Sequence, residues 1–118
     1  MNSAARATLV TALQQYFSIP GDEAALVLDE FEPCVCRGGD WLFRQGDGAD
    51  CLFLLARGRM QVWLAQSNGQ EPGERLVAEV NPGETIGEIG MLTGGARSAS
   101  IRAVRNSLLL KMTSAAFD

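Results

Sequence analysis

Between Pro33 and Met112 the chain consists of short apolar or alternating runs, each closed by a turn signal, and this pattern constrains the fold most strongly. In one run, Met60, Val62 and Leu64 recur at every second position, which is the period of a β-strand. Similar runs cover Cys34–Cys36, Trp41–Phe43, Cys51–Ala56, Met60–Ala65, Leu76–Val80, Ala99–Val104 and Leu108–Met112. About eight short strands at near-regular spacing predict a small antiparallel β-sandwich or roll.

Residues 1–32 follow a different period and predict two helices. The first can be capped by Ser3, and its apolar stripe comprises Leu9, Val10, Leu13 and Phe17. Ile19–Gly21 interrupts this pattern. The second helix can be capped by Asp22, and its stripe comprises Ala24, Val27, Leu28 and Phe31. We therefore expect the helices to precede the strands and to pack by one face.

The expected organisation is one domain over residues 1–118, with helices in 1–32 and the roll in 33–112. A polar hairpin loop is expected at Ser67–Gly73, and Asp47 and Asp50 are typical turn residues. At 113–118, Thr113 or Ser114 can cap a further helix. That helix would be barely one turn long and unstable by itself. We therefore expect this chain to be a piece cut from a longer protein.

The composition excludes several functional classes. With 47% hydrophobic residues the chain can bury a core, and a net charge of −4 gives no basic field for nucleic acid. The longest apolar run, Cys51–Ala56, is too short to cross a bilayer, and the N-terminus lacks a secretory signal. With no His, a cupin-type metal enzyme is disfavoured. The odd set Cys34, Cys36 and Cys51 indicates reduced thiols, as in cytoplasm.

The Gly-rich segment Pro82–Ser100 carries the strongest functional signal. Glu88 and Arg97 lie at its two ends, nine positions apart. An Arg fork can bind phosphate oxygens, and the carboxylate can accept a hydrogen bond from a sugar hydroxyl. Each residue alone could equally be an ordinary surface Arg or an acid at a helix N-terminus. Together they favour a nucleotide pocket, with neither side chain expected in the core.

The order of these elements resembles the cyclic nucleotide-binding domain, from about Tyr16 to the end of the chain. The motifs that carry the resemblance are Phe43–Asp47, then Asp50–Met60 with its glycine turn, then Pro82–Gly90 and Arg97–Ser100. This family includes catabolite-activator-type transcription factors, regulatory subunits of cyclic-AMP-dependent kinase and cyclic-nucleotide-gated channels. The resemblance implies an eight-stranded antiparallel β-roll, jelly-roll-like, with a phosphate-binding cassette at 83–100 that contains a short helix.

The resemblance also implies roles for individual residues of the cassette. Glu88 matches the acid that accepts the ribose 2′-OH, and Arg97 the residue that pairs with the exocyclic phosphate oxygens. Gly87, Ile89 and Gly90 match positions that offer backbone amides near the ribose and phosphate. Ser98 matches a further phosphate contact. Ser100 matches a position where a hydroxyl reaches the purine edge in some members, and a solvated strand hydroxyl is the alternative there.

The resulting expectation is a bacterial, cytoplasmic sensor that binds cyclic AMP in preference to cyclic GMP and performs no catalysis. No other cofactor and no metal are expected. The effector would lie outside this chain, as a transcription factor, a channel or transporter segment, or a phospholipase. Formation of a homodimer is possible. Neither membrane insertion nor direct nucleic-acid binding by this chain is expected. The alternative is a degenerate roll that binds no nucleotide and acts as a protein interaction scaffold.

Overall fold

The computed structural model describes residues 2–67, 72–87 and 95–113, within which the chain forms two helices and eight strands. The elements are α1 (Ser3–Phe17), α2 (Gly21–Leu28), β1 (Glu32–Cys36), β2 (Trp41–Phe43), β3 (Cys51–Arg57), β4 (Met60–Ser67), β5 (Pro72–Val80), β6 (Thr85–Ile86), β7 (Ser100–Ala103) and β8 (Ser107–Thr113). The strands form two antiparallel four-stranded sheets, β1-β8-β3-β6 and β2-β7-β4-β5. The predicted antiparallel eight-stranded architecture is confirmed.

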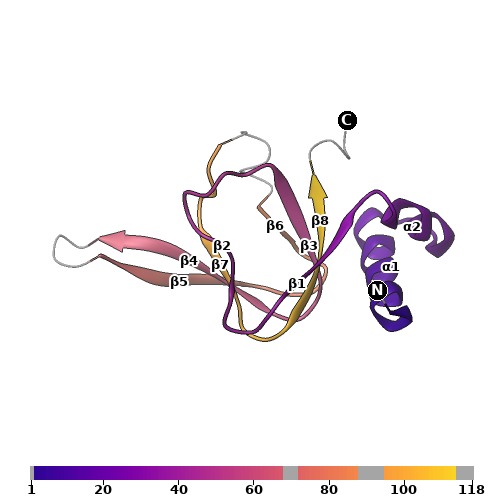
Figure 1. The fold of residues 1–118 in the computed structure, drawn as a ribbon, viewed down its shortest axis with the longest axis horizontal. Helices are drawn as coiled ribbons and strands as arrows, with labels where there is room; N and C mark the ends of the chain where they lie inside the picture. The colour runs from indigo at the N-terminus through magenta and orange to yellow at the C-terminus, as the bar shows by residue number, and fades with distance from the viewer. Residues whose placement is uncertain (1, 68–71, 88–94, 114–118) are drawn as a thin grey trace.

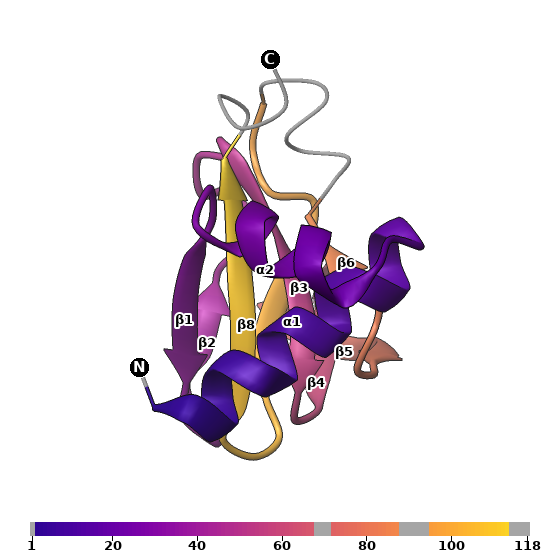
Figure 2. The ribbon, with the colours of Figure 1, turned by 90° about the vertical axis from the view of Figure 1, so that its right-hand side faces the viewer.

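The sheet β1-β8-β3-β6 is the middle layer of the molecule (Figure 1). The helices cover its outer face, where α1 crosses β8 and β3 (Figure 2), and the second sheet faces its inner side. Strand β3 is therefore buried on both faces. Leu52 and Leu54 belong to the core under the helices, whereas Cys51, Phe53 and Leu55 belong to the core between the sheets. Burial on both faces explains why this strand reads as an unbroken apolar run.

The helices begin slightly earlier than the sequence predicted. The N-cap of α1 is Asn2, not Ser3, and its side-chain oxygen accepts a hydrogen bond from the backbone N–H of Ala5 at 2.7 Å. Asn and Ser are equally good caps, so residue type alone could not choose between them. Helix α2 follows Pro20, which places Asp22 in its first turn, where an acid is favoured by the helix dipole.

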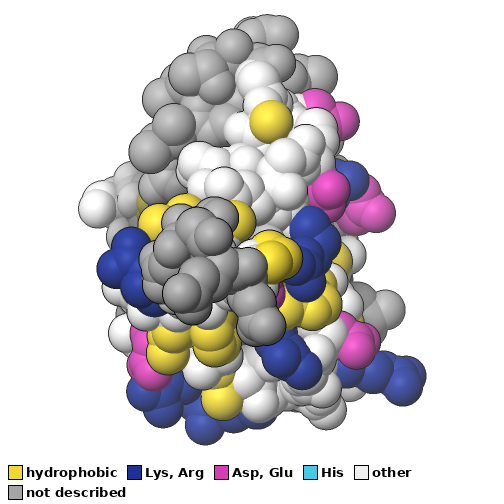
Figure 3. Space-filling model, turned by 90° about the vertical axis from the view of Figure 1, so that its left-hand side faces the viewer, with side chains coloured by type: hydrophobic (Ala, Val, Ile, Leu, Met, Phe, Trp, Pro, Cys, Tyr) yellow, Lys and Arg dark blue, Asp and Glu magenta, His cyan; other side chains and the backbone are white. Residues whose placement is uncertain are grey.

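Strands β4 and β5 form a long hairpin that projects from the roll (Figure 1). The sequence placed Ser67, Pro72 and Gly73 in a loop, but Ser67 pairs with Pro72 and both belong to strands. A proline is tolerated there because it is the first residue of an edge strand. Viewed from the end where the hairpin projects, apolar side chains lie among charged ones (Figure 3), and Leu76 and Val77 of β5 are exposed.

Strand β6 was not predicted, because two residues are too few to show an alternating period. Its pairing with Phe53 and Leu54 of β3 nevertheless fixes the start of the Gly-rich segment against the middle layer. The helices expected within 83–100 and at 113–118 involve residues 88–94 and 114–118, which lie outside the described residues. No helix in the described part of the chain is long and apolar enough to span a bilayer.

Candidate functional site

A cavity of about 160 Å³ lies between the inner face of the second sheet and β6. Its wall is mostly apolar and is formed by Phe43, Val62, Val80, Ile86, Ala99 and Ile101. Its polar residues are Thr85, Gly87, Arg97 and Ser98. The cavity thus has an apolar wall and a cationic group, as a ligand with a flat apolar part and an anionic part requires.

Arg97 is the cationic group of this cavity, and it is buried with only 5% of its surface exposed. The expectation that it would lie outside the core is therefore wrong. Its guanidinium lies over the ring of Phe43, with 4.2 Å between Cζ and the ring centroid. Nη1 donates to the carbonyl oxygen of Gly87 at 3.3 Å, and Nη2 donates to the Cys51 sulfur at 3.4 Å. All these partners are neutral.

The charge of Arg97 is uncompensated by any described carboxylate. The ion pairs among described residues are Arg6–Asp29, Arg44–Glu74 and Arg59–Glu79. In addition, Nε of Arg97 is buried and has no hydrogen-bond partner among the described residues. A desolvated cation with a vacant donor is costly, and an anion in the cavity would offset that cost through charge-assisted hydrogen bonds. The arrangement is suited to binding an anionic oxygen.

Gly87 follows β6 directly and has a left-handed backbone, with φ of +89°. A Cβ at this position would overlap Nη1 of Arg97 and lie 3.3 Å from its Cζ. Glycine is therefore required both by the backbone conformation and by the space that the guanidinium occupies. Gly87 and Arg97 are the two predicted site residues that the structure brings into direct contact.

The remaining predicted site residues are placed differently. Ser98 is exposed and lines the cavity beside Arg97. Ser100 is 1% exposed, and its hydroxyl oxygen accepts a hydrogen bond from the backbone N–H of Gln45 at 2.7 Å. It is therefore no solvated hydroxyl, and it lies on the opposite face of β7 from cavity-lining Ile101. A purine contact at Ser100 stays a prediction that this geometry does not favour. Glu88, Ile89 and Gly90 lie outside the described residues.

Sequence reasoning missed the apolar wall of the cavity and two residues that contact Arg97, which are Phe43 and Cys51. The sequence placed Phe43 in the expected strand Trp41–Phe43 and gave it no role in the site, yet its ring lies under the guanidinium of Arg97 and lines the cavity. Cys51 lies at the first position of β3, where its sulfur contacts the same guanidinium. Nothing in the local sequence around either residue indicates Arg97 as its partner, because the contacts arise only when β2, β3 and the Arg97 segment come together.

The three cysteines are free, as predicted, and none of the described residues form a cluster suited to holding a metal ion. Burial raises the pKa of the thiols of Cys34, Cys36 and Cys51 above the ordinary value of 9.0. For Cys51 the Arg97 guanidinium opposes that rise in pKa. These thiols are therefore protonated at neutral pH and act as small apolar side chains.

These raised thiol pKa values predict a loss of stability in alkali. Above about pH 9 the unfolded chain releases thiol protons that the folded chain retains, so the free energy of unfolding should fall as the pH rises. Urea titrations between about pH 7 and pH 10 measure this fall. The variant Cys36→Ala, outside the cavity, should show a shallower fall than the parent protein. An equal slope in both proteins would contradict the assignment to this thiol.

The chain is similar in sequence to a known domain family and to proteins that contain such domains. A family model, that of the cyclic nucleotide-binding domain, matches residues 34–118. The cyclic AMP receptor protein of Thermus thermophilus is 34% identical over 97 residues, covering 82% of this chain and 44% of that protein. The patatin-like phospholipase domain-containing protein 7 of Rattus norvegicus is 35% identical over 80 residues, covering 68% of this chain and 6% of that protein.

A solved structure gives the same result for the fold. The crystal structure of the Thermus thermophilus catabolite activator protein superimposes with a TM-score of 0.75 at 32% identity, covering 87% of this chain and 47% of that chain. The chain thus spans less than half the length of each of these relatives.

Proposed function

Since the chain belongs to the cyclic nucleotide-binding domain family, we propose that it is a regulatory sensor domain for a cyclic purine mononucleotide. The observation that carries the proposal is the buried guanidinium of Arg97, which lines the cavity and whose Nε has no hydrogen-bond partner among the described residues. A cyclic phosphodiester supplies the missing negative charge. Arg97 and Ser98 bind its oxygens, Gly87, Ile89 and Gly90 border the phosphate and ribose, and Glu88 accepts the 2′-OH.

Within this proposal cyclic AMP is the favoured ligand over cyclic GMP. The cavity wall away from Arg97 is apolar and includes Val62, Val80 and Ile101. Guanine carries one more carbonyl group than adenine and presents a different set of polar edge groups. Burying an unpaired polar group against such a wall costs free energy. The name of the cyclic AMP receptor protein, a relative at 34% identity, supports the same choice.

The proposed output is control of an effector outside this chain. The domain itself performs no reaction, and ligand acts by binding one arrangement of the neighbouring segments more tightly than another. The relatives support this view, because the matched region is a small part of a phospholipase-domain protein and under half of a receptor protein. The three free thiols are consistent with a cytoplasmic location. The competing function is a scaffold that binds no nucleotide.

Calorimetry with cyclic AMP and with cyclic GMP tests the proposal. We expect one site per chain, tighter binding of cyclic AMP, and a raised melting temperature. Ligand at about a hundred times its Kd should add roughly 2.7 kcal/mol to the free energy of unfolding. Adenosine, which has the base and ribose without the phosphate, serves as the control and should bind weakly. If neither cyclic nucleotide at millimolar concentration produces a heat of binding or a change in melting temperature, the sensor function is wrong and the scaffold function takes its place.

A second prediction tests the role of Glu88. Replacing it with Ala removes a charge-assisted hydrogen bond to the ribose hydroxyl, so cyclic AMP binding should weaken by about 1.5–3 kcal/mol. The parent protein should bind the 2′-deoxy analogue of cyclic AMP much more weakly than cyclic AMP itself. The Glu88→Ala variant should bind the two ligands with nearly equal affinity. Competition titrations against cyclic AMP measure both effects. Equal affinity of the parent protein for the deoxy analogue and cyclic AMP would show that Glu88 is not the ribose acceptor.

A further inference from the structure

The outer face of the sheet β2-β7-β4-β5 presents Trp and Arg side chains. Val62 of β4 lines the cavity on the inner face, so the next residue, Trp63, points outward, and it pairs with Leu76 of β5. In the neighbouring row Trp41 of β2 pairs with Arg102 of β7, whose Cζ lies 5.3 Å from the indole centroid. Both Trp side chains are half-buried, and Leu76 is 43% exposed. The face therefore offers aromatic and apolar area on the outside of the roll.

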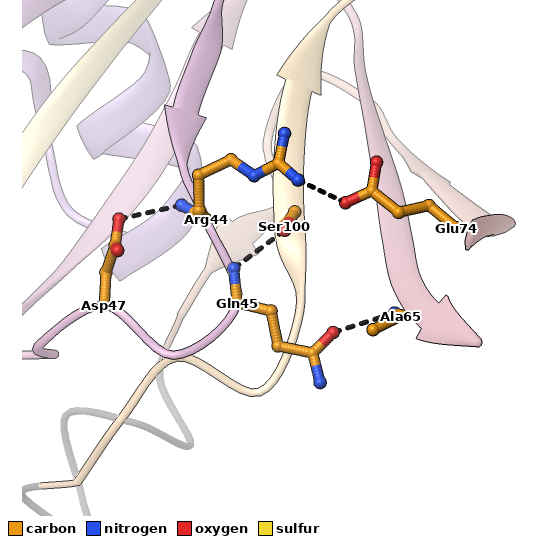
Figure 4. A network of polar contacts seen from close by, with 6 residues as sticks. All are labelled: Arg44, Gln45, Asp47, Ala65, Glu74 and Ser100. Carbon is orange, nitrogen blue, oxygen red and sulfur yellow. Dashed lines mark hydrogen bonds and ion pairs between the residues drawn. The ribbon is translucent and has the colours of Figure 1, made fainter. Parts of the chain in front are cut away.

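Polar contacts hold this outer face together. Arg44 lies over the ring of Trp41, with 4.0 Å between Cζ and the ring centroid, and its Nη2 donates to Glu74 of β5 at 2.5 Å (Figure 4). Beside it, Gln45 Oε1 accepts a hydrogen bond from Ala65 N–H of β4 at 2.9 Å (Figure 4). The segment after β2 is thus fixed to the β4–β5 hairpin. A surface fixed in this way loses little conformational entropy when a partner binds to it.

This end of the molecule carries more basic than acidic side chains. Arg44 and Arg59 each form an ion pair with a Glu of β5, whereas Arg75 and Arg102 have no ion-pair partner among the described residues. Four Arg thus stand against two Glu. Viewed from the hairpin end, basic side chains border apolar ones (Figure 3). A partner that matches this face is acidic and has an exposed apolar side chain.

The helical end of the molecule has this complementary character. Leu26 of α2 is 74% exposed. The four positions next to it on a helix surface, at i−4, i−3, i+3 and i+4, are all acidic, namely Asp22, Glu23, Asp29 and Glu30. Residues 1–32 contain one Arg and five acids, so they carry the whole net charge of −4 and the remainder of the chain is neutral. An exposed Leu surrounded by carboxylates is therefore available on every copy of the chain.

We propose that the outer face of the sheet β2-β7-β4-β5 binds α2 of a second copy of this chain, with Leu26 at the centre of the contact. An apolar centre with a polar surround is the usual composition of a specific interface, and opposite charges favour the encounter. The helices and the hairpin lie at opposite ends of the long axis, which extends 54 Å (Figure 1). The contact is therefore head-to-tail and builds an open chain of domains.

Analytical ultracentrifugation of the parent protein tests this association. At low ionic strength the weight-average mass should rise with protein concentration and exceed that of two chains. In about 1 M NaCl, where the Debye length is about 3 Å, the mass should fall toward that of one chain. Leu26→Glu and Leu76→Glu should each raise the Kd of self-association at least about tenfold. Val35→Glu is the matched control: Val35 is 67% exposed on β1, outside both surfaces, and its substitution should leave the Kd unchanged.

Mixing two variants tests the head-to-tail arrangement. Leu26→Glu keeps an intact sheet face and Leu76→Glu keeps an intact α2, so an equal mixture should form pairs although each variant alone is monomeric. The pairs should not grow further, because only damaged surfaces remain at their ends. Circular dichroism checks that each variant keeps the parent fold. If Leu76→Glu does not fold, Arg102→Glu reverses an unpaired charge of the same face and replaces it in the mixture.

Several results would overturn the inference. A parent protein that stays monomeric at every concentration and at low salt has no such contact. An equal loss in Val35→Glu would show a general effect of added charge, and a mixture that stays monomeric would exclude the head-to-tail contact. Binding of a fluorescent oligothymidylate by a monomeric parent protein would assign the Trp and Arg face to nucleic acid. Neither surface includes the cavity, so Leu26→Glu should bind cyclic AMP like the parent, and the sensor function is tested separately.

Discussion

Replacing Arg97 with Ala is expected to abolish tight binding of cyclic AMP, with a loss on the order of 2–5 kcal/mol of binding free energy. The phosphate would then enter a cavity whose wall is otherwise apolar or neutral. Removing one member of a desolvated charge pair leaves the other uncompensated, and this penalty is larger than the net strength of the pair. Calorimetry gives the affinity, and cyclic GMP should lose as much as cyclic AMP.

The ligand-free variant Arg97→Ala should stay folded, although the side chain is buried. The loss of packing on Phe43 is offset by removal of a buried cation that has no described carboxylate partner. Arg102→Ala is the matched control, because Arg102 lies on the exposed face of the adjacent strand β7 and over Trp41. Its affinity should equal that of the parent protein. Comparable losses in both variants would indicate a general effect of charge and contradict a specific phosphate contact.

The local sequence pattern predicted where the strands lie in the chain, but it did not predict which strands pair with one another in the sheets. The alternation in β4 and the apolar run of β3 are properties of a few consecutive residues, so they could be recognised without a structure. The pairing of β3 with both β8 and β6 joins segments far apart in the chain, and no local period encodes it. The same limitation explains why β6, with two residues, was missed.

The sequence indicated the chemistry of the candidate site but not its surroundings. Glu88 and Arg97 in the Gly-rich segment predicted a nucleotide pocket; the structure places Arg97 in contact with Gly87, and Glu88 lies outside the described residues. The burial of Arg97 by Phe43 depends on how β2 meets the Gly-rich segment, which sequence spacing cannot give. For Ser100, alternation with Ile101 already placed its side chain opposite the apolar face of β7. The resemblance alone suggested a base contact there, and the hydrogen bond from Gln45 gives the hydroxyl a structural partner.

The second large effect is expected at Gly87, where Gly87→Ala should weaken cyclic AMP binding at least tenfold. The added methyl group would occupy the space of Arg97 Nη1, so the guanidinium must leave its position over Phe43. The backbone at φ of +89° adds strain, because a left-handed conformation costs a non-glycine residue roughly 1–2 kcal/mol. Binding and stability should therefore both fall, and calorimetry and urea titration measure them separately.

Gly83→Ala separates these two causes. Gly83 has nearly the same φ, +94°, but a Cβ there meets no atom within 4 Å. It should therefore lose stability by about the same strain, roughly 1–2 kcal/mol, while keeping its affinity for cyclic AMP. The difference in Kd between the two variants then measures the displacement of Arg97 alone. If Gly83→Ala weakens binding as much as Gly87→Ala, backbone strain explains both losses, and the contact between Gly87 and Arg97 does not control the anion site.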